Sequence, residues 1–186
     1  MLNPRLAGRY AKSLIDLAKE KNALEEVHKD MLFMKEATKN NEFVALLRSP
    51  VIKADKKIKI VDAITKGKVS PITAAFNKLL IEKSRESTLP EIITSFINQY
   101  KQFKEIYSVK LTTATPVSND VKNEIVQKVK EQTGLKNIEL IEKVDEDIIG
   151  GFKLELGDTL IDATISYDLN KVKSQFLDNE FIYKIR

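Results

Sequence analysis

The sequence predicts an α+β protein: an N-terminal six-helix bundle over residues 1–108, followed by a small C-terminal α/β domain with a short sheet and a β-hairpin over residues 109–186. Apolar residues recur at helical spacing in the first range, and apolar and polar residues begin to alternate in the second. The net charge also changes sign, because the first range holds 20 Lys and Arg against 13 Asp and Glu, and the second holds 11 against 14. This asymmetry indicates two domains with different partners.

The composition is that of a folded, helix-rich protein, with 186 residues, of which 42% are hydrophobic and 31% charged. No cysteine is present, which excludes disulfides and cysteine-ligated zinc. The acids Asp16 and Glu20 argue against an N-terminal transit peptide. No stretch approaches the roughly 20 apolar residues needed to cross a bilayer. Any membrane association is therefore expected to be indirect.

Helix-start signals divide the first half. A proline at the first helical position follows Asn3 at the start of the first helix and Ser70 at the start of the fifth. Thr88 opens the sixth helix and has the spacing of a capping box with Glu91. The helices between the first and the fifth are expected over Leu24–Lys39, Phe43–Leu47 and Lys56–Lys66.

The first and fifth helices each carry a broad apolar face. These faces contain Leu6, Tyr10, Leu14 and Leu17 in the first helix, and Ile72, Ala75, Phe76, Leu79 and Leu80 in the fifth. Core packing is the ordinary interpretation of any one such residue. Two broad faces in a small bundle also predict a groove that accepts a partner helix.

In the second half, strands are expected over Val109–Ala114 and Ile138–Ile141, and helices over Ser118–Gln132 and Asp168–Phe181. Gly157-Asp158 has the sequence of a two-residue turn between two further strands. The resulting pairs are Leu156 with Thr159, Leu154 with Ile161, Phe152 with Ala163 and Lys153 with Asp162. This register gives one apolar surface and one opposite-charge pair, which favours it.

The acidic stretch before this pair of strands superficially resembles a calcium loop. If Asp145 were the first ligand, Asp147 would be the third position and Gly150 the sixth, but Ile149 and Leu156 would occupy two other ligand positions. A phosphate loop is disfavoured because its glycines lead into a strand, and no helix N-terminus follows. The acids are expected to form a solvated turn.

No recognisable catalytic centre is present in the sequence. The single histidine, His28, lies among charged residues and is expected on a solvated helix face. We therefore expect no catalytic, cofactor-binding or metal-binding residue, and no enzyme. A carboxylate pair assembled only by the fold stays open at this point.

A basic cluster in the first half suggests nucleic-acid binding as the alternative function. It comprises Lys53, Lys56, Lys57, Lys59, Lys66 and Lys68. The cluster lacks interleaved aromatic residues, a zinc pattern and a recognition helix, so a solvated helix surface is favoured. A basic nucleic-acid-binding adaptor, or another helical adaptor, remains the alternative.

Three motifs resemble the delta subunit family of bacterial F-type ATP synthases, which is related to the mitochondrial oligomycin sensitivity-conferring protein. They are RYAKSLIDLA at 9–18, LLIEKSRESTLPEIITSF at 79–96 and VDEDIIGGFKLELGDTLIDATISYDL at 144–169. The resemblance covers essentially the whole chain. It departs from the family pattern at Glu146, where a proline is common, and at Ser166 and Asp168, where basic residues are common.

The resemblance implies a non-catalytic stator subunit without cofactors, present in a single copy in a hetero-oligomer. Such a subunit links the catalytic head to the membrane sector and resists rotor torque during proton-driven ATP synthesis. The helical domain would receive N-terminal helices of the alpha subunits, one of them in the groove between the first and fifth helices. The groove residues would be Tyr10, Leu14, Ile72, Phe76 and Leu79. The C-terminal domain would meet the b subunits, at the cytoplasmic face of the bacterial inner membrane and without nucleic acid.

Overall fold

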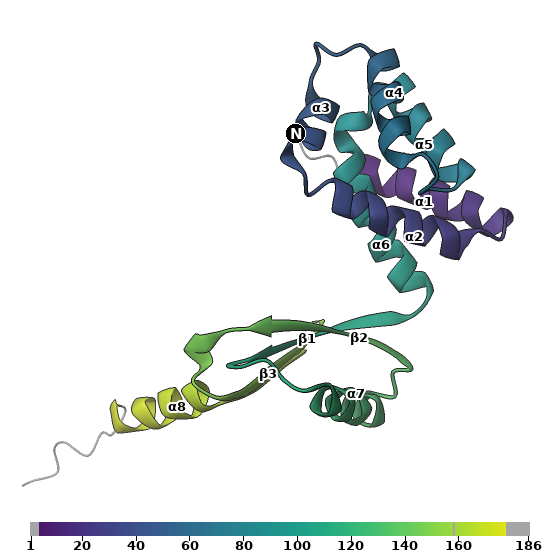
Figure 1. Ribbon diagram of the computed structural model, residues 1–186. Helices are drawn as coiled ribbons and strands as arrows, with labels where there is room; N and C mark the ends of the chain where they lie inside the picture. Colours follow the sequence, from purple (N-terminus) through teal and green to yellow (C-terminus); the bar gives the residue numbers. More distant parts are fainter. Residues whose placement is uncertain (1–3, 158, 178–186) are drawn as a thin grey trace, which may run out of the picture. The chain divides into compact units, whose positions relative to one another are not determined.

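The computed structural model describes residues 4–157 and 159–177. It confirms the α+β class, with helices and a mixed four-stranded sheet (Figure 1). The chain divides into two compact units, 1–103 and 104–186. The division precedes the expected boundary at 108 because the first strand already begins at Ile106. The expected N-cap at Asn3, the turn residue Asp158 and the end of the closing helix lie outside the described residues.

The first unit consists of helices around one apolar core. They are α1 (Pro4–Glu20), α2 (Leu24–Ala37), α3 (Asn41–Arg48), α4 (Ala54–Thr65), α5 (Pro71–Glu82), the 3-10 turn η1 (Glu86–Thr88) and α6 (Leu89–Phe103). Helices α1 and α6 pack closely because α1 turns Ala7, Ala11 and Ala18 toward the core. The Gln99 side chain of α6 donates a hydrogen bond to the carbonyl of Gly8 at 3.1 Å.

Two of the expected helix starts differ in outcome. The Ser70 hydroxyl accepts a hydrogen bond from the backbone N–H of Thr73 at 3.4 Å, and a proline opens α5, as expected. The expected capping box at Thr88 is wrong. Its hydroxyl donates instead to the carbonyl of Arg85 at 2.7 Å, because α6 continues directly from the 3-10 turn that ends at Thr88.

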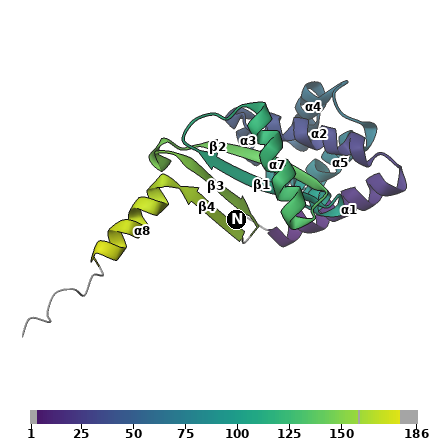
Figure 2. The ribbon, with the colours of Figure 1, turned by 90° about the horizontal axis from the view of Figure 1, so that it is seen from below.

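The second unit is a sheet in the order β2-β1-β3-β4, with α7 packed on one face (Figure 2). Its elements are β1 (Ile106–Thr113), α7 (Asn119–Thr133), β2 (Asn137–Val144), the 3-10 turn η2 (Glu146–Ile148), β3 (Gly151–Leu156), β4 (Thr159–Thr164) and α8 (Ile165–Leu177). Strand β1 pairs parallel with β2 and antiparallel with β3. The core of this unit centres on Val109, Leu111 and Leu154.

Strands β3 and β4 pair antiparallel in the register that the sequence predicts. The pairs include Leu156 with Thr159, Leu154 with Ile161, Phe152 with Ala163 and Lys153 with Asp162. Gly151 has φ +79°, and a Cβ at this position would lie 2.2 Å from the carbonyl oxygen of Ala163. Glycine is therefore required here for close approach of the two strands.

The acidic stretch forms a turn, as expected. Asp145 pairs with Lys143 at 2.7 Å, and this neighbouring ammonium lowers the pKa of the Asp145 carboxyl. The following residues form η2, and Ile149 ends this turn with φ +69°. The structure thus places the acids and Gly150 of this segment in the connection between β2 and β3, and Gly151 at the start of β3.

Candidate functional site

Tyr10 and Phe76 bring the two predicted groove helices together. Their rings meet edge to face, with centroids 6.4 Å apart and planes at 68°. This is a favourable arrangement for aromatic pairs, because the positive edge of one ring faces the negative face of the other. Both side chains are half-buried, so each contributes to packing and keeps part of its surface exposed.

A pocket of about 320 Å³ follows α1 beside this aromatic pair. It is lined by Leu6, Arg9, Tyr10 and Ser13, which are neighbours on one side of the helix. On α5, Leu79 is 44% exposed, and Ile72 is half-buried. The accessible apolar surface therefore extends over both helices.

Leu14 is the predicted groove residue that the structure places elsewhere. It is 1% exposed and belongs to the core of the first unit. The apolar stripe on α1 is broad enough to serve two purposes: one edge packs inward, and the edge carrying Leu6 and Tyr10 faces the pocket. Leu14 therefore packs in the core beneath Tyr10 and has almost no exposed surface that a partner could contact.

The apolar face expected on α5 is divided between the core and the surface. Its buried residues are Thr73, Asn77, Leu80 and Ile81, whereas Ala75 and Leu79 are exposed. Among the described residues, the buried Asn77 side-chain amide has no hydrogen-bond partner, whereas the Thr73 hydroxyl donates to a buried acid on α2.

That acid is Asp30, which is 5% exposed. Its Oδ2 accepts hydrogen bonds from the Ser70 N–H at 2.8 Å, the Ser70 hydroxyl at 2.6 Å and the Thr73 hydroxyl at 2.7 Å. A carboxylate at a helix N-terminus also interacts favourably with the helix dipole. Asp30 thus fixes the start of α5 against α2 and helps to set the position of the groove wall. No local sequence pattern indicates this contact, because Asp30 lies 40 residues before Ser70.

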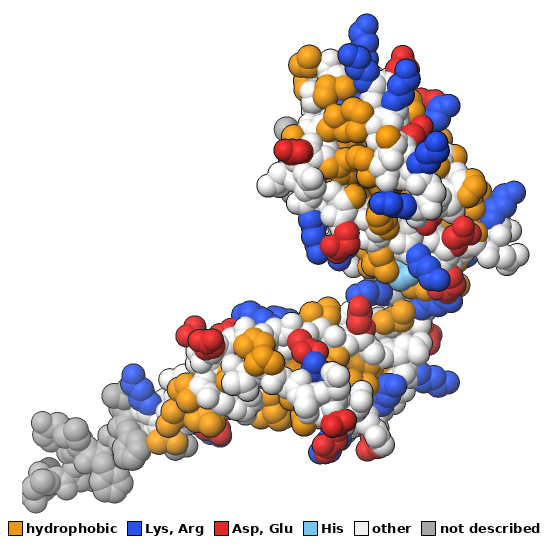
Figure 3. Space-filling model, viewed as in Figure 1, with side chains coloured by type: hydrophobic (Ala, Val, Ile, Leu, Met, Phe, Trp, Pro, Cys, Tyr) orange, Lys and Arg blue, Asp and Glu red, His pale blue; other side chains and the backbone are white. Residues whose placement is uncertain are grey.

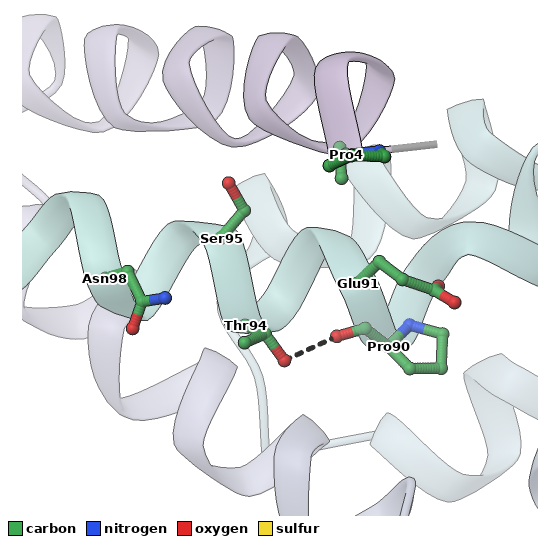
Figure 4. A pocket seen from close by; sticks show the side chains of 7 residues that line it. Pro4, Pro90, Glu91, Thr94, Ser95 and Asn98 are labelled. Carbon is green, nitrogen blue, oxygen red and sulfur yellow. Dashed lines mark hydrogen bonds between the residues drawn. The ribbon is translucent and has the colours of Figure 1, made fainter. Parts of the chain in front are cut away.

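A second pocket, of about 560 Å³, lies where α1 begins beside the first half of α6 (Figure 4). It is lined by Pro4, Ala7, Pro90, Glu91, Thr94, Ser95 and Asn98. Ser95 points toward α1, and the Thr94 hydroxyl donates to the carbonyl of Pro90 at 2.9 Å. Glu91 Oε2 is buried without a hydrogen-bond partner. Nothing in this mixed lining defines a ligand.

His28 does not lie on a solvated face as expected. It is half-buried and stacks on Tyr100 of α6, with ring centroids 3.8 Å apart and planes at 7°. The Tyr100 hydroxyl donates to Glu25 at 2.6 Å. Burial, together with this hydrogen bond and the Glu25 charge, raises the pKa of Tyr100 to about 12. The cluster joins α2 to α6.

The basic cluster is partly structural. Lys57 is 3% exposed; its ammonium contacts Glu86 at 2.6 Å and donates to the carbonyl of Leu47 at 3.0 Å. It therefore holds α4 against α3 and η1. This removes Lys57 from the surface expected for nucleic-acid binding, while Lys53, Lys56, Lys59, Lys66 and Lys68 are exposed.

In the second unit, α8 leaves an apolar stripe exposed. Ile165, Leu169 and Val172 recur at helical spacing and are 47%, 54% and 47% exposed. The helix packs on its own unit through β4 and η2. Figure 3 shows hydrophobic side chains gathered over the part of α8 next to the sheet. A stripe of this kind is typical of a surface that binds a partner.

Within the described ranges, no three His, Asp or Glu side chains are arranged to hold a metal ion. In the same part of the chain, no helix is both long and apolar enough to cross a bilayer. The features that stand out in the described residues are therefore two accessible apolar surfaces, one in each unit: the surface that carries Tyr10, Phe76 and the pocket along α1, and the stripe on α8.

Comparisons with known proteins relate the chain to one family. Residues 6–176 match the model of a family described as ATP synthase delta (OSCP) subunit. Relatives named ATP synthase subunit delta, from Cytophaga hutchinsonii and Christiangramia forsetii, are 38% and 34% identical, over 98% and 100% of this chain and 100% of each relative. A chain in the cryo-EM structure of the Toxoplasma gondii mitochondrial ATP synthase hexamer shares the fold. It has 23% identity and a TM-score of 0.70, over 92% of this chain and 97% of that one.

Proposed function

Because the chain belongs to the ATP synthase delta (OSCP) family, whose members are non-catalytic peripheral-stalk subunits, we propose that it joins the catalytic head to the stalk through two separate surfaces. The observation that supports this most directly is the accessible apolar surface in each unit. A stator needs affinity and rigidity at both ends, and large apolar side chains supply such affinity. The protein would act at the cytoplasmic face of the bacterial inner membrane, in a single copy, resisting rotor torque during proton-driven synthesis.

The first surface is the groove between α1 and α5, which would accept the N-terminal helix of an alpha subunit. Tyr10, Phe76, Ile72 and Leu79 would contact that helix, because all four keep exposed apolar surface on the two helices. An amphipathic helix buries one face in such a groove, and a few large side chains supply most of the affinity.

The second surface is α8, which would contact the b subunits at the end of the peripheral stalk. Glutamates in place of Leu169 and Val172 would put charge on the exposed stripe without entering the core, since both side chains are about half exposed. The Leu169→Glu, Val172→Glu variant is therefore expected to fold and to lose the b subunits.

The test is an affinity purification of tagged full-length protein from gently solubilised native membranes, with mass spectrometry of what is retained. The wild type is expected to retain alpha, beta and b subunits. The α8 variant is expected to retain alpha and beta but not b, and Phe76→Ala is expected to retain less alpha and beta. If the α8 variant still retains b, and Phe76→Ala retains as much alpha and beta as the wild type, the assignment of the two surfaces is refuted. Recovery of nucleic acid without these subunits would refute the function.

A further inference from the structure

The proposed groove between α1 and α5 has an asymmetric charge on its α1 side. Arg5, Arg9 and Lys12 lie on the exposed side of α1 at spacings of four and three residues, so they form one row along the helix. Arg9 itself lines the pocket with Leu6, Tyr10 and Ser13. The row therefore borders the apolar surface of the groove over the first turns of α1.

The described part of the chain does not neutralise this row. No carboxylate of residues 4–157 and 159–177 lies within ion-pair distance of Arg5, Arg9 or Lys12. The first turn of α1 contains no acid, although a helix N-terminus favours one. Three cations beside the proposed groove thus have no ion-pair partner among the described residues, although Asp16 lies one turn after Lys12 on α1.

We infer that this row selects the partner: the helix bound in the groove carries acidic residues along the flank that lies beside α1. The apolar residues of the groove would supply most of the affinity, and the three cations would supply charge selection and faster association. A basic flank would place like charges together at the rim and would be disfavoured. The inference rests on the proposed function, because it takes this groove as the helix-binding surface.

The test compares two synthetic peptides of about 18 residues, roughly five helical turns. They share one apolar face and differ only in carrying Glu or Lys on both flanks, so that either orientation presents the same charge to α1. Binding to the full-length protein is measured at about 20 mM and about 500 mM salt, since screening weakens exposed charge pairs. The wild type is expected to bind the Glu peptide about ten-fold more tightly at low salt, with a smaller preference at high salt.

Two charge-reversal variants distinguish the effect of the Arg5, Arg9 and Lys12 row from the effect of the protein's net charge. Arg5→Glu, Arg9→Glu is expected to lose or reverse the preference. Lys130→Glu, Lys136→Glu changes the net charge equally at exposed sites in the second unit, and it is expected to keep the preference. Circular dichroism checks that both variants are folded.

Equal binding of the two peptides, binding of neither, or equal effects of the two variants would overturn the inference. Binding of the protein to isolated catalytic head is measured in parallel. If the head binds but the peptides show no charge preference, the charge inference fails alone. If the head does not bind, the proposed function fails as well.

Discussion

Tyr10 of α1 and Phe76 of α5 form an edge-to-face pair, with ring centroids 6.4 Å apart, at the border between the core and the exposed surface. Each ring is half-buried, so the pair fixes the spacing of the two helices and still presents apolar surface. Leu14, one turn from Tyr10 on α1, is buried beneath. Core packing and the proposed helix binding would therefore depend on different residues of the same helix.

Phe76→Ala is expected to weaken binding of an alpha-subunit N-terminal peptide by about 2 kcal/mol, because a large apolar anchor is truncated. The measurement is isothermal titration calorimetry with full-length protein. Val51→Ala, at a side chain that is 86% exposed, serves as the control and should leave binding unchanged. Unchanged affinity in a folded Phe76→Ala protein would remove Phe76 from the site.

Leu14→Ala should show the opposite pattern. Removing a fully buried leucine leaves a cavity and is expected to lower the free energy of unfolding by about 2–5 kcal/mol. Urea unfolding followed by circular dichroism measures this loss. At temperatures where the variant stays folded, its peptide affinity should remain near that of the wild type. A large affinity loss in a folded variant would return Leu14 to the groove surface.

Asp30→Ala is expected to lower the free energy of unfolding by about 3 kcal/mol, because it leaves the N–H and hydroxyl of Ser70 and the hydroxyl of Thr73 without their buried acceptor. Asp16→Ala, at an exposed acid, is the control. Equal stability of the two variants in urea would show that the Asp30 network does not hold α5 in place.

The sequence was informative where structure is local. The pairing of β3 with β4 follows from alternation around Gly157, and the start of α5 follows from Ser70 and the proline after it. Both signals act between residues that are close along the chain. The expected capping box at Thr88 failed because a 3-10 turn, equally local, competed for the same hydroxyl.

The candidate site was less predictable because exposure depends on contacts distant in the chain. Periodicity identified the apolar residues of α5, but Thr73 is buried because it meets Asp30, which lies 43 residues earlier. Lys57 is likewise buried by Glu86, 29 residues later. A scale that counts lysine and threonine as surface residues does not anticipate such pairs.

Tyr100→Phe is expected to lower stability at neutral pH by about 1–2 kcal/mol through loss of the hydrogen bond to Glu25. The raised pKa of Tyr100, about 12, also gives a pH dependence. The unfolded chain loses this proton near pH 10, so the stabilisation is present below about pH 10 and is lost as pH rises through about 12. Urea unfolding of the wild type and Tyr100→Phe across this range should show the difference between their free energies of unfolding shrinking.

Tyr107→Phe, at an exposed tyrosine, controls for hydroxyl removal. Identical alkaline profiles for Tyr100→Phe and wild type would refute this origin.

Gly151→Ala and Gly157→Ala test the close approach of β3 and β4 with a matched pair. Both glycines have positive φ, +79° and +55°, so alanine carries a conformational cost of about 1–2 kcal/mol at each. A Cβ at Gly151 would also lie 2.2 Å from the carbonyl oxygen of Ala163, whereas a Cβ at Gly157 would have no atom within 4 Å. We expect Gly151→Ala to cost at least about 2 kcal/mol more, because backbone must move. Hydrogen exchange of the β3 and β4 amides reports this loss within the second unit. If the two variants exchanged at the same rates, the requirement for glycine would lie in φ alone, and the strand contact would not explain it.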